Sequence, residues 1–196
     1  MTTPILFDID KTLIDTEHLR QHMQDLATAE LKISKEVYEK ANKKFVSTLE
    51  HPHDFHPTGF FQYLEKHHGS TAKYLLQRFY EPAMFESFAY PDVLPALKRL
   101  SQSHPLGIFS EGFASFQTKK LELSGLMRYF NPGLTFIFRR KLSPDSLALV
   151  PKNALIIDDA LDVVKALVDL GYSAKLIDRN NTSPRVKNRI SSLEEL

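Results

Sequence analysis

The stretch ILFDIDKTL, at residues 5–13, decides the fold, because it has the pattern of a buried strand that runs into two acidic residues. Its apolar beginning, residues 5–9, is typical of a strand in a parallel sheet. Asp8 and Asp10 interrupt this apolar run. Burial of one unpaired carboxylate is costly, and burial of two neighbours should be worse. Something at this point of the chain must therefore offset that cost.

The composition is that of an ordinary soluble globular protein. The chain has 196 residues, which is enough for one core of moderate size plus an insertion. A formal net charge of +1 gives no overall attraction to nucleic acid or to an anionic membrane, so we expect neither partner. The absence of cysteine excludes a disulfide scaffold, a thiolate metal site and a cysteine nucleophile.

The start of the chain has no basic segment followed by a long apolar stretch, so we expect no signal peptide. No apolar run approaches the length that crosses a membrane. Together with the missing cysteines, these features favour a cytoplasmic protein. No pattern in the sequence indicates the oligomeric state.

Short apolar runs alternate with helical patterns over most of the chain. The expected strands are residues 5–9, 106–109, 134–138 and 154–157, with a weaker one at 174–177. The expected helices between them are residues 92–100, 113–126 and 160–170. This alternation predicts an α/β fold with a doubly wound, Rossmann-like parallel sheet.

One long stretch, residues 15–88, contains no convincing strand. It carries helical patterns at residues 18–31, 35–49, 58–67 and 71–79, and it is rich in aromatic residues. We expect an inserted all-helical cap domain here, large enough to cover the carboxyl end of the sheet. The catalytic core would then consist of residues 1–14 and 89–196.

Each of the first four expected strands ends in, or is followed by, polar residues that are costly to bury. The residues concerned are Asp8 and Asp10, then Ser110, then the basic run at residues 139–141, then Asp158 and Asp159. In open α/β sheets, ligands bind beyond the carboxyl ends of the strands. We therefore expect several carboxylates, a hydroxyl group and a cation to converge in one cleft.

Such a set of groups suits phosphoryl transfer. Clustered aspartates can bind a hard cation such as Mg²⁺, whose charge offsets the burial of the carboxylates. One carboxylate can attack phosphorus, and a second can give a proton to the leaving group and later take one from water. A lysine and a serine hydroxyl can hold the phosphoryl oxygens as charge redistributes.

These residues resemble the four motifs of the haloacid dehalogenase (HAD) superfamily. The matching segments are DIDKTL at residues 8–13, IFSEG at 108–112, a lysine after the next strand, and IIDDALD at 156–162. Residues 90–100 and 120–130 also look like this family. A helical insertion between the first and second motifs is similar to the phosphoglycolate phosphatase-like branch.

The resemblance implies three catalytic residues. Asp8 would be the nucleophile, and Asp10 would be the general acid and base. Lys141 would pair with Asp8 and with the phosphate. Members of the family that cleave carbon–halogen or carbon–phosphorus bonds generally lack an aspartate at the position of Asp10. Its presence therefore favours hydrolysis of a phosphate ester, although phosphotransfer to another sugar stays open.

The resemblance also implies the binding residues. Those expected at the phosphoryl group are Thr12, Ser110, Glu111 and Gly112. Those expected at the Mg²⁺ ion are Asp8, the backbone carbonyl of Asp10, Asp158, Asp159 and Asp162. In this set Asp158 would be a direct ligand, whereas Asp159 and Asp162 would hold the waters of the metal. Ser110 and Asp158 could instead be helix N-caps, and Glu111 could lie in a first helical turn.

The third motif departs from the family pattern. Its lysine is usually followed at once by proline, but Leu142 and Ser143 stand between Lys141 and Pro144. Other basic residues are therefore alternative candidates for this role, namely Arg139, Arg140, Lys119 and Lys120.

Seven of the eight histidines fall in the expected cap, and three of them lie in the tract EHPHDFHP at residues 50–57. This tract looks faintly like the metal site of a metallohydrolase. It is flanked by proline and lies between helical patterns, so a solvated loop is the simpler interpretation.

We therefore expect a Mg²⁺-dependent phosphatase that hydrolyses a small phosphorylated metabolite through an aspartyl-phosphate. The alternatives are a phosphotransferase or phosphomutase of the same superfamily, a metallohydrolase that uses the histidine tract, and a non-catalytic binding module. The sequence does not identify the substrate, because specificity would lie in the cap.

Overall fold

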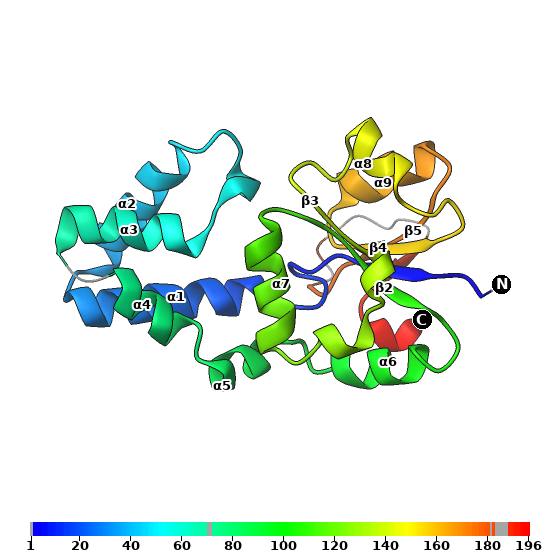
Figure 1. Ribbon diagram of the computed structural model, residues 1–196, viewed down its shortest axis with the longest axis horizontal. Helices are drawn as coiled ribbons and strands as arrows, with labels where there is room; N and C mark the ends of the chain where they lie inside the picture. The colour runs from blue at the N-terminus through cyan, green and yellow to red at the C-terminus, as the bar shows by residue number, and fades with distance from the viewer. Residues whose placement is uncertain (1, 70–71, 181, 183–187) are drawn as a thin grey trace.

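The computed structural model describes residues 2–69, 72–180, 182 and 188–196. Its centre is a six-stranded, entirely parallel sheet with the strand order β3-β2-β1-β4-β5-β6. The strands are β1 (Ile5–Phe7), β2 (Leu106–Glu111), β3 (Thr135–Phe138), β4 (Leu155–Asp158), β5 (Ser173–Ile177) and β6 (Arg189–Ile190). The prediction of an α/β fold with a parallel sheet is confirmed (Figure 1).

Strand β1 lies between β2 and β4 in the middle of the sheet. Ile5 pairs with Leu106 on one side and with Leu155 on the other. All three residues of β1 are buried, as expected for a strand that is covered on both faces. The backbone N–H of Asp8 donates to the carbonyl of Ile157 at 2.9 Å, so the first aspartate is held where β1 and β4 end.

Alternate residues of β1 point to two different hydrophobic cores. Ile5 and Phe7 pack in a core with helices α6 (Val93–Leu100) and α7 (Ala114–Leu123). Leu6 packs in a second core on the opposite face, with α8 (Pro144–Ala148) and α9 (Leu161–Asp169). Figure 1 shows α6 on one side of the sheet and α8 and α9 on the other. The sheet is therefore doubly wound.

Residues 15–88, which we call the helical insert, lie within the connection from β1 to β2 and precede helix α6. The insert contains α1 (Thr16–Leu31), α2 (Lys35–Val46), α3 (Pro57–His68), α4 (Ala72–Phe79), α5 (Pro82–Phe85) and two short 3₁₀ helices, Pro52–Asp54 and Glu86–Phe88. Figure 1 shows α1 to α4 extending away from one end of the sheet. A group of phenylalanines, including Phe60 and Phe61, fills their interface and is fully buried.

The chain enters and leaves the insert at one place. The backbone N–H of Asp15 donates to the carbonyl of Phe88 at 2.7 Å, and that of Tyr90 donates to Leu13 at 3.1 Å. The Asp15 side chain also accepts a hydrogen bond from the N–H of His18 at 3.0 Å, which caps α1 as it begins. The two connections therefore run side by side at the boundary between the insert and the sheet.

Several boundaries differ from those expected. Strand β1 ends at Phe7 rather than at residue 9, because the chain turns back at Lys11, whose φ is +59°. Strand β2 extends to Glu111, because it pairs with β3 as far as Phe138. Strand β6 was not predicted, since two residues are too few to form a pattern. The residues of β3, at the edge of the sheet, are only half-buried.

The helices of the insert also differ slightly from those expected. Helix α2 ends at Val46 rather than at residue 49, and α4 begins at Ala72. Thr71, the expected start of α4, lies outside the described residues. Over the described ranges, no helix has both the length and the apolar character needed to cross a membrane.

Gly107 allows a close approach in the middle of β2. A β-carbon at this position would collide with the backbone oxygen of Leu134 and would lie 2.6 Å from a methyl carbon of Leu6. Only glycine fits there without displacing the neighbouring backbone.

Candidate active site

Three residues that follow or end strands meet at the carboxyl end of the sheet. The ammonium group of Lys141 lies 3.1 Å from a carboxylate oxygen of Asp8 and 2.5 Å from one of Asp158. These side chains are buried, with exposed fractions of 5% for Asp8, 6% for Lys141 and 0% for Asp158. Of the basic residues considered for the third motif, Lys141 is therefore the one that reaches Asp8.

The electrostatics of this group show an excess of negative charge. Burial raises the pKa of Asp8 to about 8; the Lys141 ammonium opposes the shift, and the carboxylates of Asp158, Asp10 and Asp159 add to it. Burial and Asp158 likewise raise the pKa of Asp159 to about 6. Burial by itself would lower the pKa of Lys141, but Asp8 and Asp158 raise it, so the lysine stays charged.

One lysine therefore faces several buried carboxylates, and a further cation would stabilise their ionised forms. An all-oxygen donor set of this kind fits a hard divalent ion such as Mg²⁺. Asp158, the last residue of β4, is inside the strand rather than at a helix N-cap, and its side chain accepts from the N–H of Ala160 at 3.0 Å. Asp159 is half-buried and Asp162 is exposed, and both line the adjoining cavity.

Asp10 points toward helix α7 instead of toward Lys141. Its two carboxylate oxygens lie 2.6 Å and 2.8 Å from the ammonium of Lys120, a buried residue of α7. The Gln117 amide donates to Asp10 at 2.8 Å, and the Thr16 hydroxyl donates at 2.7 Å. Burial alone would raise the pKa of Asp10, but Lys120 and these hydrogen bonds lower it. Asp10 is therefore held in its ionised form.

Residues of the second motif reach the carboxyl end of the sheet from strand β2. Ser110 is buried within the strand and is not a helix N-cap. Glu111 is the last residue of β2 rather than part of a helical turn, and its carboxylate accepts from the backbone N–H of Lys141 at 3.1 Å. Gly112 follows with φ +131°, a conformation that favours glycine.

Thr12 lies in the loop after β1 and is completely buried. Its backbone carbonyl accepts hydrogen bonds from the Arg179 guanidinium at 2.6 Å and 3.2 Å. Its hydroxyl has no partner among the described residues. Arg179 also pairs with Asp92 at 2.8 Å, so a partly buried network fixes the loop that carries the first motif.

A cavity of about 710 Å³ adjoins these residues. Asp8, Asp10 and Lys141 line it from the sheet, and residues of α1 and α2, including Tyr38 and Asn42, line it from the helical insert. Asp8, Asp10 and Lys141 thus open onto a space between the sheet and the insert that is large enough for a small organic molecule.

The histidine tract is only in part the solvated loop that was expected, because His53 is exposed whereas Asp54 and His56 contact residues near the sheet. Asp54 is buried and lies 2.7 Å from the guanidinium of Arg139 and 2.9 Å from that of Arg140. The ring of His56 lies 3.3 Å from the hydroxyl of Ser115. Arg139 and Arg140 therefore bind the insert, while Lys141 beside them faces Asp8.

The sequence did not reveal Gln117 as part of the site, and it offered Lys120 for a different role. A usable signal was present, because these two polar residues are three positions apart in an expected helix and so share a face. The pairing of Asp54 with two arginines left no such signal, since 85 positions separate Asp54 from Arg139.

Similar folds occur among solved structures. A HAD phosphatase from Thermococcus onnurineus shares 26% identity over 100% of this chain and 95% of its own, with a TM-score of 0.70. A magnesium-bound protein of Bacillus subtilis assigned to the HAD hydrolases shares 21% identity over 99% and 96% of the two chains, with a TM-score of 0.66. A haloacid dehalogenase-like family hydrolase from Xanthomonas campestris shares 16% identity over 98% and 88%, with a TM-score of 0.62.

No curated protein matches the sequence. The family described as haloacid dehalogenase-like hydrolase matches residues 5–141, a segment that contains the first three motifs and the whole helical insert. Because this match covers more than half of the chain, the protein belongs to the haloacid dehalogenase-like hydrolases, a family of enzymes.

Proposed function

We propose that this enzyme is a Mg²⁺-dependent phosphatase that acts on a small phosphorylated metabolite through an aspartyl-phosphate. One observation carries the proposal: the buried carboxylate of Asp8, 3.1 Å from the Lys141 ammonium and beside Asp158, lines a cavity of about 710 Å³. A nucleophile, a cation and a metal-binding carboxylate are thus combined at one place.

The residues that would hold Mg²⁺ are Asp8, the backbone carbonyl of Asp10, and Asp158, with Asp159 and Asp162 on its waters. When bound, the ion would neutralise the excess carboxylate charge and would polarise the phosphoryl group. The raised pKa values of Asp8 and Asp159 support this assignment, because burial and the neighbouring carboxylates disfavour their ionised forms and a bound cation would offset both effects.

In the first half of the proposed reaction, a carboxylate oxygen of Asp8 forms a bond to phosphorus, and the bond from phosphorus to the ester oxygen breaks. Asp10 gives a proton to that leaving oxygen. In the second half, water attacks phosphorus, Asp10 takes a proton from it, and the bond to Asp8 breaks with release of phosphate. Lys141 and Ser110 hold the phosphoryl oxygens throughout.

Asp10 cannot give a proton in the arrangement described above, because its hydrogen bonds to Lys120, Gln117 and Thr16 keep it ionised. About a third of its side chain is exposed, with an exposed fraction of 33%. We infer that this is a resting position, and that Asp10 leaves Lys120, takes a proton from solvent and turns toward the substrate before it acts as an acid.

We further propose that residues 15–88 form a cap domain and that residues 1–14 and 89–196 form the catalytic core. The cavity between them supports this division, because a bound substrate would contact both. The insert would exclude bulk water during turnover and would limit the size of the substrate.

Phosphate release from p-nitrophenyl phosphate tests the proposal, with Mg²⁺ or EDTA present. We expect Mg²⁺-dependent turnover in the wild type and none in Asp8→Asn. Asp145→Asn is a matched control, because Asp145 is exposed on α8. Equal turnover in wild type and Asp8→Asn would refute the assignment of Asp8. If neither protein turns over this ester, Mg²⁺-dependent trapping of beryllium fluoride by wild type but not Asp8→Asn provides the second test, and its absence would count against the proposal.

A further inference from the structure

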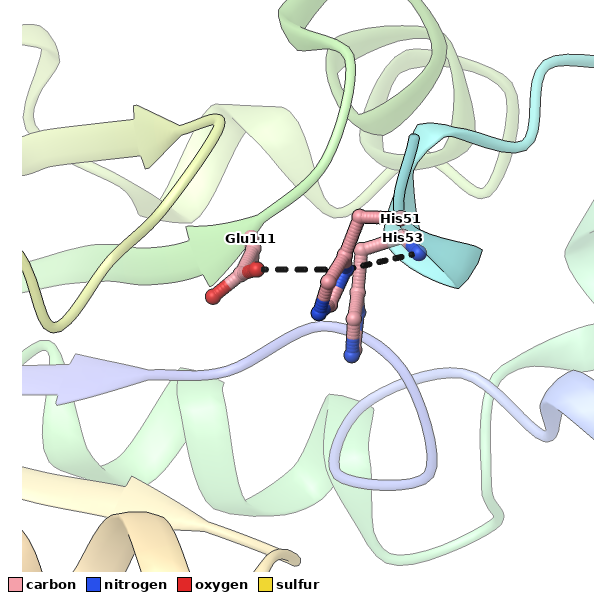
Figure 2. Close-up of side chains that lie close together, drawn as sticks. All are labelled: His51, His53 and Glu111. Atoms are coloured by element: carbon pink, nitrogen blue, oxygen red, sulfur yellow. Dashed lines mark hydrogen bonds and ion pairs between the residues drawn. The ribbon is translucent and has the colours of Figure 1, made fainter. Parts of the chain in front are cut away.

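We propose that His51, His53 and Glu111 form a second metal site, one that binds a transition-metal ion such as Zn²⁺ between the helical insert and the sheet. Each of the three side chains offers one ligand atom, and these atoms all lie within 4.8 Å of one another. Figure 2 shows both imidazole rings beside the Glu111 carboxylate. The two histidines come from the insert, and the glutamate ends strand β2.

The local backbone places both histidines on one side. His51 and His53 are two positions apart at the beginning of the 3₁₀ helix Pro52–Asp54. Their rings lie side by side, with centroids 4.9 Å apart and planes inclined by only 20°. In Figure 2 both rings extend from this turn in the same direction. Two imidazoles are therefore presented together, which a single histidine on a solvated loop would not achieve.

Glu111 is oriented by a contact of its own. One carboxylate oxygen accepts the backbone N–H of Lys141 at 3.1 Å, and the other lies 4.0 Å from a ring nitrogen of His51. Hydrogen bonds of this kind fix the direction of a metal-binding carboxylate. The side chain is also largely buried, with an exposed fraction of 15%. The acidic ligand is therefore held in place before any ion arrives.

The residues that flank the tract anchor it to the sheet region. Asp54 pairs with Arg139 and Arg140, and His56 contacts Ser115 at 3.3 Å. Asp54 also offsets part of the positive charge that the arginines bring near the site. The contacts of Asp54 and His56 thus keep His51 and His53 close to Glu111, at the boundary between the insert and the sheet.

The donor set selects the type of ion. Two imidazoles and one carboxylate suit Zn²⁺, Co²⁺ or Ni²⁺, whereas Mg²⁺ prefers oxygen ligands. Bonds of about 2.0–2.2 Å to such an ion require ligand atoms roughly 3.3 Å apart. The separations of up to 4.8 Å must therefore contract, and the exposed position of His53 gives its ring room to turn. A bound ion would connect the insert to the sheet and would hold them together.

Titration with Co²⁺ in the presence of saturating Mg²⁺ tests the site, because Mg²⁺ protects the aspartates. We expect one equivalent of Co²⁺ to bind with visible ligand-field absorption. The double variant His51→Ala/His53→Ala should bind at least tenfold more weakly, and Glu111→Gln should also bind more weakly. His67→Ala/His68→Ala is the matched control and should behave as wild type. Equal binding by wild type and the double variant, or no binding at all, would overturn the site.

The absence of cysteine makes a direct test of bridging possible. Spin labels at Lys43→Cys on α2 and Lys165→Cys on α9, both exposed positions, report the distance between insert and sheet. We expect Zn²⁺ to narrow the distance distribution, but not when His51 and His53 are alanine. An unchanged distribution despite binding would overturn the bridging role. Neither readout requires turnover, so failure here is distinguishable from failure of the proposed phosphatase activity.

Discussion

The Lys120 ammonium lies within 2.8 Å of both carboxylate oxygens of Asp10. Lys120 is 3% exposed, and its charge also lies 4.4 Å from the ring centre of Phe116. A buried lysine therefore binds the aspartate that we propose as the general acid and base. The same contact connects the loop after β1 to helix α7.

Lys120→Met should lower kcat by roughly ten- to hundredfold with little change in KM, because the ionised Asp10 that takes a proton from water in the second half of the proposed reaction loses the cation that stabilises and positions it. Steady-state kinetics over a range of pH would measure this effect. Lys120→Arg should restore part of the activity, since it keeps the charge. Lys119→Met is the matched control, because Lys119 is a half-exposed neighbour that pairs with Glu122. An unchanged kcat in Lys120→Met would exclude the positioning role.

Asp8→Asn should stabilise the metal-free protein at neutral pH. The pKa of Asp8 is about 8 in the folded state and 3.8 as the ordinary value, so the folded state binds more protons between these limits. Asp8 therefore destabilises the folded state least below pH 3.8. The free energy of unfolding falls as the pH rises from there toward 8. Relative to Asp8→Asn, the wild type should lose about 3 kcal/mol between pH 5 and pH 7.5.

Urea denaturation in EDTA at the two pH values would measure this difference. Added Mg²⁺ should reduce it, because the ion favours ionised Asp8. Asp145→Asn, at an exposed position, should follow the wild type. Parallel stability curves for wild type and Asp8→Asn would mean that Asp8 has no raised pKa.

Asp54→Asn should loosen the contact between the insert and the sheet. Arg140 and Arg139 lower the pKa of Asp54 to about 2, so the carboxylate is ionised at all working pH values. Loss of its charge should raise KM roughly three- to tenfold if closure of the insert accompanies substrate binding. Steady-state kinetics would show the change. Glu50→Gln, an exposed acid in the same tract, should leave KM near the wild-type value, and an equal KM for Asp54→Asn would contradict the expectation.

Gly107→Ala should destabilise the fold by about 3 kcal/mol, because overpacking the centre of a sheet forces the backbone to shift. The added methyl group would collide with the Leu134 carbonyl. Gly133→Ala is a suitable control, since its β-carbon would meet only the Asn131 side chain at 3.4 Å. Thermal unfolding of both variants would decide the point. A small effect at Gly107 would show that β3 can move away from β2.

The sequence was informative where a residue's place follows from the strand it belongs to. Asp8 and Asp158 come together because both follow apolar runs that become neighbouring parallel strands, β1 and β4. The order of the strands was not needed for this inference, because the carboxyl ends of all strands in a parallel sheet lie at the same end of the sheet.

The sequence was least informative about side-chain direction. Lys120 and Lys141 were both candidates for one role, and the choice depends on which way each points from its own element. The structure places Lys141 beside Asp8 and Lys120 beside Asp10. Contacts between the insert and the sheet, such as that of Asp54 with Arg139, depend on how two separately folded layers meet. No local pattern encodes that arrangement.

The central position of β1 has a consequence for how the chain folds as it is synthesised. Ile5 pairs with Leu106 and Leu155, so its partners leave the ribosome about a hundred and a hundred and fifty residues later. Contacts between such distant residues form slowly, and an unpaired apolar strand is prone to aggregate. The helices of the insert have mostly local contacts and can form first. The segment that carries Asp8, the proposed nucleophile, therefore pairs late, and a chaperone that shields this segment would raise the yield of folded enzyme.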